Sequence, residues 1–237
     1  MAESPPMAQP PPMAEPVVPV LESGHARAEA PEGTPVAAMT WGQLRAAVQD
    51  CTRCGLCRGR TRTVFGSGAQ DSPWMIVGEA PGAEEDARGE PFVGQAGRLL
   101  ESMLGALGLS RERDVFIANV LKCRPPGNRN PEPDEIRQCE PYLHRQIALL
   151  KPRGVLVMGR FAAQALLQTD ATIASLRGRV HAYRANGEDL PLVVTYHPAY
   201  LLRNLPDKAK AWADLCLARE RFGPGAPRGA ESGLRAV

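Results

Sequence analysis

Three polar residues of this sequence, a glutamate, an asparagine and a histidine, each mark the end of a short apolar run. These are Glu79 after residues 74–77, Asn119 within residues 115–120, and His197 after residues 192–195. Each alone is a common turn or loop residue. If the runs are parallel strands, their carboxyl ends meet at one edge of a sheet, where open α/β folds bind ligands. A carboxylate, an amide and an imidazole at that edge predict an active site.

Hydrophobic periodicity indicates the elements that would position these residues. We expect strands at 74–77, 115–120, 154–158 and 192–195, and helices at 97–107, 133–150 and 161–167. Strands that alternate with helices predict a parallel sheet covered on both faces. The predicted fold is a three-layer α/β/α sandwich with a central, mainly parallel, four-stranded sheet.

Three further elements extend this prediction. Thr40 is typical of an N-cap, and Gln43 three residues later completes a possible capping box for a helix that ends near residue 51. Residues 180–183 form a candidate strand that a glycine-containing turn joins to the strand at 192–195. A final helix is expected from about 207 to 221.

Composition divides the chain into one domain and two tails. Residues 1–38 hold nine of the 23 prolines and show no periodicity, which predicts a disordered Pro/Ala-rich tail. Residues 223–237 are rich in Gly, Ala and Arg and are expected to form a flexible C-terminal tail. The folded domain is therefore predicted at 40–222.

The overall composition narrows the class of protein. Of the 28 Lys and Arg residues only four are lysine, which mildly favours nucleic-acid binding and equally fits a bias in genomic base composition. The sequence contains no run of eighteen apolar residues and no signal-peptide pattern at its N-terminus, so we expect a cytoplasmic protein without a membrane span. In that compartment six cysteines predict metal or redox roles rather than disulfides.

The cysteine spacing predicts a metal site. Cys51, Cys54 and Cys57 form a C-x2-C-x2-C pattern after a helix, and Cys123 and Cys139 follow across a Pro-rich loop. Four thiolates suffice for a [4Fe–4S] cluster or for structural zinc, and the ligand type alone does not separate the two. Cys57 is either a replacement ligand or a spare thiol. The sixth cysteine, Cys216, is expected in the core face of the final helix.

Four segments resemble a known enzyme family. They are Gly-Glu-Ala-Pro-Gly at 78–82, Pro-Phe-Val-Gly at 91–94, Asn-Val-Leu-Lys-Cys-Arg-Pro-Pro at 119–126 and His-Pro-Ala-Tyr-Leu-Leu-Arg at 197–203. In this order they resemble the iron–sulfur-cluster uracil-DNA glycosylases, family 4 of that superfamily, over about residues 41–221. The resemblance implies a monofunctional DNA repair glycosylase that flips uracil out of DNA, hydrolyses its N-glycosidic bond and leaves an abasic site.

The same resemblance implies roles for residues. Glu79 and His197 would be catalytic, one assisting water or stabilising the sugar cation and the other donating to the leaving base. The residues implied in binding uracil are Ala80, Gly82, Glu85, Phe92 and Asn119, with Phe92 stacking on the base and Asn119 pairing with its edge. Leu201, Leu202 and Arg203 would belong to the loop that fills the gap left by the flipped base.

The family's cluster ligands correspond to Cys51, Cys54, Cys123 and Cys139, so the resemblance implies a structural [4Fe–4S] cluster, with zinc as the alternative cofactor. Near it, Arg58, Arg60, Arg62 and Arg124 become candidate phosphate contacts. We expect a monomer that acts on uracil-containing DNA, single- or double-stranded. The rival hypothesis is an iron–sulfur nucleic-acid-binding or redox-sensing module without glycosylase activity.

Overall fold

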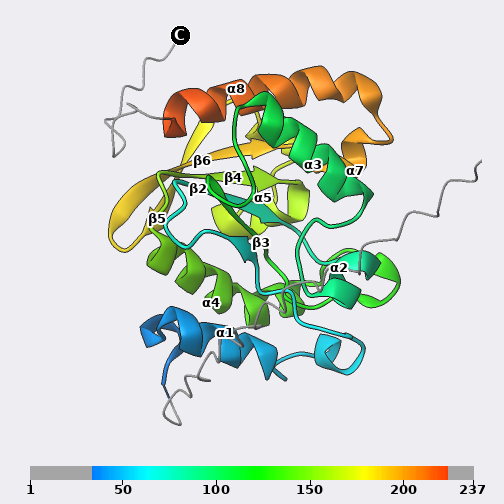
Figure 1. The fold of residues 1–237 in the computed structure, drawn as a ribbon, viewed down its shortest axis with the longest axis vertical. Coiled ribbons are helices and arrows are strands. Elements are labelled where there is room, and N and C mark those ends of the chain that lie inside the picture. The colour runs from blue at the N-terminus through cyan, green and yellow to red at the C-terminus, as the bar shows by residue number, and fades with distance from the viewer. Residues whose placement is uncertain (1–33, 224–237) are drawn as a thin grey trace, which may run out of the picture.

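The computed structural model describes residues 34–223 (Figure 1). The predicted C-terminal tail and most of the predicted N-terminal tail lie outside the described residues, so the domain boundaries stay a prediction. Within 34–38 the chain forms a short 3-10 helix, η1 Val36–Ala38. The guanidinium Nε of Arg145 donates to the carbonyl of Met39 at 2.7 Å, which fastens the start of the domain to a long helix.

A six-stranded, mostly parallel sheet forms the centre of the domain. Its order is β1-β3-β2-β4-β6-β5. The four parallel strands are β2 Trp74–Gly78, β3 Val115–Asn119, β4 Gly154–Met158 and β6 Glu188–Thr195. The two antiparallel edge strands are β1 Ser67–Gly68, beside β3, and β5 Val180–Ala185, beside β6.

The predicted fold class is confirmed, but the predicted count of four strands was too low. The strand β5 forms at the place where a further strand was considered. The strand β1 has only two residues, a serine and a glycine, so no hydrophobic pattern could indicate it. It forms because the edge of β3 offers free backbone groups to a neighbouring segment.

Helices cover the sheet on both faces and complete three layers (Figure 1). On one face, α1 Trp41–Gln49, α4 Pro133–Leu150 and α5 Arg160–Leu167 pack against side chains such as Met75 and Val77. On the other face, α3 Gln95–Ala106 and α8 Lys208–Phe222 pack against Trp74 and Ile76. Alternate residues of β2 thus enter opposite cores, as the two-residue period of a strand requires.

The helix ends follow local chemistry. At α1 the predicted capping box is present, because the backbone amide of Thr40 donates to the Gln43 side chain at 2.9 Å. Cys216 was expected in the core but is exposed, because the buried face of α8 is formed by Ala211, Leu215, Ala218 and Phe222. In the described part of the chain no helix is long and apolar enough to cross a membrane.

Short elements carry the loops at the carboxyl edge of the sheet. They are η2 Gly55–Arg58, α2 Ala83–Arg88, η3 Pro126–Asn128, α6 Ile173–Leu176, α7 Pro198–Leu201 and η4 Leu205–Asp207. Of these, α2 follows β2, η3 follows β3 and α7 follows β6. The chain therefore places its irregular segments where the parallel strands end, the edge at which the sequence predicts an active site.

Candidate active site

A cleft of about 730 Å³ opens at the carboxyl ends of the parallel strands. All seven residues predicted to be catalytic or to bind the base line it: Glu79, Ala80, Gly82, Glu85, Phe92, Asn119 and His197. They come from three strand ends and the loops that follow them. The structure therefore brings together groups that lie more than a hundred residues apart in the sequence.

Glu79 is held at the N-terminus of α5. The backbone amide of Phe161 donates to Glu79 Oε1 at 3.1 Å. Burial raises the pKa of Glu79 above its usual value, and the Phe161 amide and the charge of Arg160 act against this shift. Gly159 adopts a left-handed φ of +99°, and a Cβ atom there would overlap Glu79 Oε1. A glycine at this position is what leaves room for the carboxylate.

His197 caps α7 and is neutral at physiological pH. Its Nδ1 atom accepts a hydrogen bond from the backbone amide of Ala199 at 3.1 Å. Burial lowers the pKa of His197 to about 4, with the charge of Glu85 raising the pKa and that of Arg203 lowering it. A neutral imidazole that accepts at Nδ1 carries its proton on Nε2. The site therefore holds a hydrogen-bond donor rather than a cation.

Asn119 places an unsatisfied acceptor in the cleft wall. The residue is 2% exposed, and its Oδ1 atom is buried with no hydrogen-bond partner among the described residues. A Cβ atom at Gly78 would overlap this oxygen and the ring of Phe92, so the glycine allows the close approach. A buried amide oxygen without a partner costs about 1–3 kcal/mol. Such an atom needs a donor from outside the described residues, either a water molecule or a ligand in the cleft.

The loop at 91–94 is fixed by the carboxylate of Glu85. Glu85 Oε1 accepts from the backbone amides of Val93 at 2.9 Å and Gly94 at 3.0 Å, while Oε2 accepts from Gly82 at 3.1 Å. The prediction that Glu85 contacts the base stays a prediction. Its observed bonds show that it ties α2 to the loop that carries Phe92.

Phe92 is held in an unusual backbone conformation. Its φ is +55°, which is uncommon for a residue with a side chain, and Arg111 Nη2 donates to its carbonyl at 2.9 Å. Its ring packs against that of His197 with 5.4 Å between centroids and 27° between planes. A strained residue that several contacts hold in place is typical of a ligand-binding position. The ring and the imidazole thus fix each other in one wall of the cleft.

The predicted DNA-contacting loop divides into buried and exposed residues. Leu201, the last residue of α7, is 1% exposed and lies in the core, whereas Leu202 is 41% exposed and Arg203 lines the cleft. Leu205, which the sequence analysis did not single out, is 60% exposed in η4. Contact of this loop with DNA stays a prediction, and Leu202 and Arg203 are the members that solvent can reach.

The predicted phosphate-binding arginines also differ from one another. Arg58 and Arg62 are exposed. Arg60 turns inward, where its Nη1 atom donates to the carbonyl of Cys51 at 2.8 Å and to Cys123 Sγ at 3.2 Å. Arg124 donates to Asn128 Oδ1 at 2.7 Å and is half-buried. Arg60 therefore binds the cysteine segment and is not free to contact a phosphate, because its guanidinium is held by these hydrogen bonds.

The cysteines predicted as metal ligands line one small cavity beside α1 and α4. It is lined by Cys51, Cys54, Cys57, Cys123 and Cys139, with Arg60, Lys122 and Tyr142 among their neighbours. The backbone amide of Lys122 donates to Cys139 Sγ at 3.2 Å, a second N–H···S contact beside that of Arg60. Burial raises the pKa of the Cys123 and Cys139 thiols, so both are protonated until a metal replaces the proton.

A single metal ion does not fit the cysteines as they stand. In residues 34–223 no group of three or more Cys, His, Asp or Glu side chains is arranged to hold one ion. Four thiolates around one zinc ion each lie about 2.3 Å from it and so crowd together. Iron–sulfur clusters are likewise held by Cys thiolates. The all-sulfur donor set of the cavity therefore suits a thiolate-bound metal group.

Several residues that line the cleft were missed in the sequence. They include Asn128, Arg129, Asn130, Arg160, Tyr196 and Tyr200. Arg160 comes two residues after the end of β4, so the rule that was applied to the other three strand ends would have found it. Arg129 and its neighbours lie in the Pro-rich loop after β3, where no local pattern indicates which side chains face the cleft.

Comparison with known proteins assigns this fold and cleft to a family. A family model described as the uracil DNA glycosylase superfamily matches residues 65–216, more than half of the chain. The chain therefore belongs to the uracil DNA glycosylase superfamily. The match spans Glu79, Asn119 and His197 and all strands of the sheet.

Within that superfamily the chain is similar to type-4 members. It is 43% identical to the type-4 uracil-DNA glycosylase of Archaeoglobus fulgidus over 159 aligned residues. The alignment covers 65% of this chain and 79% of that protein. The chain is 41% identical to the type-4 enzyme of Pyrobaculum aerophilum, in an alignment that covers 78% of this chain and 95% of that protein. It is also 41% identical to that of Sulfurisphaera tokodaii, with 76% of this chain and 86% of that protein covered. The resemblance to family 4 is thus confirmed.

Proposed function

We propose that this protein is a monofunctional uracil-DNA glycosylase that removes uracil from DNA in repair. The observation that carries the proposal is the unsatisfied Oδ1 atom of Asn119 in the same cleft as Glu79 and His197. Uracil presents an N3–H donor beside an O4 acceptor. The Asn119 amide offers the complementary acceptor and donor, whereas cytosine presents the reversed pattern. The relatives named above carry this activity in their names.

The base can enter the cleft only after it has left the base stack of the DNA. A cleft wall with buried groups cannot reach the glycosidic bond inside a duplex, so the nucleotide must be flipped or already single-stranded. The aromatic ring of Phe92 gives the flipped base an apolar wall to lie against. Exclusion of thymine, which differs by one methyl group, then depends on the shape of the cleft near the base's C5 atom.

Cleavage of the C1′–N1 bond separates charge, and the cleft supplies a group for each end. Positive charge spreads over the sugar, where the Glu79 carboxylate stabilises it or orients the attacking water. The electron pair of the broken bond goes to uracil, where His197 Nε2–H donates to O2. Water adds to C1′, and the proton that it loses replaces the broken bond on the uracil anion, so that neutral uracil is released. Fixed groups of this kind lower a barrier because they need little reorganisation during the reaction.

The cysteine cavity is proposed to hold a [4Fe–4S] cluster through Cys51, Cys54, Cys123 and Cys139. When bound, the cluster would supply structure rather than chemistry, since the cavity and the cleft are lined by different residues. It would tie the segment that begins at Cys51 to the loop after β3 and to α4. Arg60 and the Lys122 amide then stabilise thiolate sulfur.

DNA is the partner that the exposed cationic groups fit. Arg160 and Arg203 line the cleft, and Arg58 and Arg62 are exposed on the segment that follows the first cysteines. Arg129 lines the cleft as well, but its guanidinium is paired with the carboxylate of Glu135. Arginine is suited to phosphate, so these groups would position the strand while Asn119 reads the base. A monomeric state, a cytoplasmic location and a DNA substrate that is single- or double-stranded stay predictions.

Base release from an oligonucleotide with one uracil tests the proposal. After incubation, alkali breaks the strand at each abasic site. Wild-type protein and Glu112→Ala, a change of an exposed glutamate outside the cleft, should give breaks. Glu79→Ala and Asn119→Ala should bind DNA and give at least about 10²-fold fewer. Full turnover by both variants, or no breaks with wild-type protein, would contradict a glycosylase and leave a binding or redox module.

A further inference from the structure

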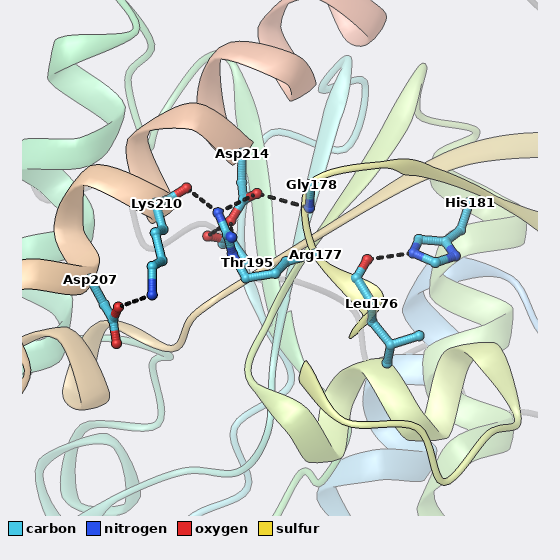
Figure 2. A network of polar contacts seen from close by, with 8 residues as sticks. All are labelled: Leu176, Arg177, Gly178, His181, Thr195, Asp207, Lys210 and Asp214. Atoms are coloured by element: carbon cyan, nitrogen blue, oxygen red, sulfur yellow. Dashed lines mark hydrogen bonds and ion pairs between the residues drawn. The ribbon is translucent and has the colours of Figure 1, made fainter. Parts of the chain in front are cut away.

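A buried carboxylate on α8 lies outside the cleft and has no part in the chemistry proposed above. Asp214 is 0% exposed. It accepts four hydrogen bonds, shown in part in Figure 2: from Arg177 Nε at 3.0 Å and Nη2 at 2.9 Å, from the Gly178 amide at 3.0 Å and from Thr195 Oγ1 at 3.0 Å. Since every partner is a donor, the carboxylate acts only as an acceptor, as its ionised form does.

A contribution to the stability of the fold is a weak explanation for a buried carboxylate such as that of Asp214. Burying a carboxylate is costly, and well-packed apolar residues of similar size often stabilise a fold as much as a buried ion pair does. Burial raises the pKa of Asp214, against which the Thr195 hydroxyl and the charge of Arg177 act. A fully satisfied polar network does fix one arrangement of the segments that it joins. The segments joined here indicate what is being fixed.

The network holds the start of the loop that carries His197. Thr195 is the last residue of β6 and lies two residues before His197. The guanidinium of Arg177 also lies over the ring of Tyr196, with 5.3 Å between its Cζ atom and the ring centroid. The two residues before His197 are therefore held in place, Thr195 by its hydroxyl bond to Asp214 and Tyr196 by the contact of its ring with Arg177.

The far side of the same loop is fastened to the beginning of α8. The ring of Tyr196 stacks on that of Tyr200 with 4.9 Å between centroids and 21° between planes. Tyr200 donates its hydroxyl to Asp207 Oδ2 at 2.6 Å, and Lys210 pairs with Asp207 at 2.9 Å. Figure 2 shows Lys210, Asp207 and Arg177 converging on this end of α8, where Arg177 also donates to the Lys210 carbonyl.

We propose that Asp214 is a positioning residue which, through Arg177 and Thr195, fixes the loop of His197 so that Nε2–H meets the leaving base. This inference rests on the proposed function. Within residues 34–223 the side chain of His197 makes one hydrogen bond, at Nδ1 with the amide of Ala199 in its own loop. Because that bond moves with the loop, the direction of Nε2–H in the cleft depends on where α8 and Arg177 hold the loop, as well as on the ring of Phe92 that packs against the imidazole.

The test separates this role from a general loss of structure. Single-turnover rates are measured for wild-type protein, Asp214→Asn, His197→Ala and the double variant, on oligonucleotides that contain uracil or 5-fluorouracil. The electron-withdrawing fluorine makes the departing base a better leaving group, so it needs less help from a donor. Asp189→Asn is the matched control, because Asp189 also lies on the sheet beside an arginine, Arg184, but on the exposed hairpin.

Asp214→Asn is expected to slow uracil release by about 10²-fold with little change in the affinity for the oligonucleotide, and to slow 5-fluorouracil release much less. In the His197→Ala background, Asp214→Asn should slow uracil release by less than a further factor of about 2, because the two substitutions remove the same interaction with the leaving base. Thr195→Val, which removes one of the four bonds, should slow uracil release about 5-fold and supports the same conclusion if Asp214→Asn does not fold.

Three results would overturn the inference. They are a folded Asp214→Asn with the wild-type rate, a loss of equal size in the His197→Ala background, and equal losses on the two leaving groups. If Asp214→Asn does not fold, a wild-type rate for Thr195→Val overturns it as well. Absence of base release by wild-type protein would instead overturn the proposed function, so the two failures are distinguishable.

Discussion

The Nδ1 atom of His197 accepts a hydrogen bond from the backbone amide of Ala199 at 3.1 Å. This contact fixes the tautomer of the imidazole, because a neutral ring that accepts at Nδ1 must carry its proton on Nε2. The low pKa of about 4 keeps the ring in that neutral form. The group available to the leaving uracil is thus a neutral donor, a point on which the sequence was silent.

The pH dependence of base release should reflect this state. His197 gains its proton only as the pH falls toward about 4, so no inflection is expected near its ordinary pKa of 6.5. Glu79, whose pKa burial raises above its ordinary 4.5, loses its stabilising charge when the pH falls through that raised pKa. Single-turnover rates should therefore fall on the acid side because Glu79 is protonated there, with no contribution from His197 near neutral pH. An inflection near pH 6.5 that disappears in His197→Ala would contradict a neutral donor.

Gly159→Ala should disable the site without a change at any catalytic residue. The added Cβ would overlap Glu79 Oε1, and the left-handed φ of +99° is itself unfavourable for alanine. Displacement of the carboxylate should lower the rate of base release by about 10²-fold. Gly105→Ala is the matched control, because a Cβ at that helical glycine meets nothing within 4 Å. Equal activity of the two variants would mean that the position of Glu79 is not critical.

Arg160→Ala should affect both DNA binding and the acid side of the pH profile. Arg160 lines the cleft, and loss of one phosphate contact should reduce the slope of log affinity against log salt by about 0.7–0.9. Its charge also lowers the pKa of Glu79, so its removal should move the fall in activity to higher pH. Arg184→Ala, on the exposed hairpin, should change neither quantity. An unchanged salt slope for Arg160→Ala would exclude the phosphate contact.

Iron content tests which cysteines hold the proposed cluster. Cys139→Ser should lose bound iron and the absorbance near roughly 400 nm that thiolate–iron bonds give. Cys57→Ser and the control Cys216→Ser, an exposed residue on α8, should retain both. Iron retained in Cys139→Ser and lost in Cys57→Ser would show that Cys57 is a ligand instead. Bound zinc in a colourless protein would revise the cofactor.

Short-range patterns were sufficient to predict the framework of the fold. The apolar runs that became β2, β3, β4 and β6 are continuous because both faces of those strands are buried. The capping box at Thr40 and Gln43 depends on residues three apart, so it too could be recognised. By contrast β1 and the exposure of Cys216 depend on what packs nearby, and the sequence analysis missed or misjudged them.

For the site, the sequence by itself determined which groups meet. Glu79, Asn119 and His197 follow parallel strands, and the carboxyl ends of parallel strands share one edge regardless of detail. Only the tertiary structure decided how those groups are held: that Gly159 leaves room for Glu79, that Glu85 ties down the Phe92 loop, and that Arg60 turns inward to sulfur. These outcomes are differences of an ångström or of a side-chain direction, and they depend on residues far away in the chain that no local pattern connects.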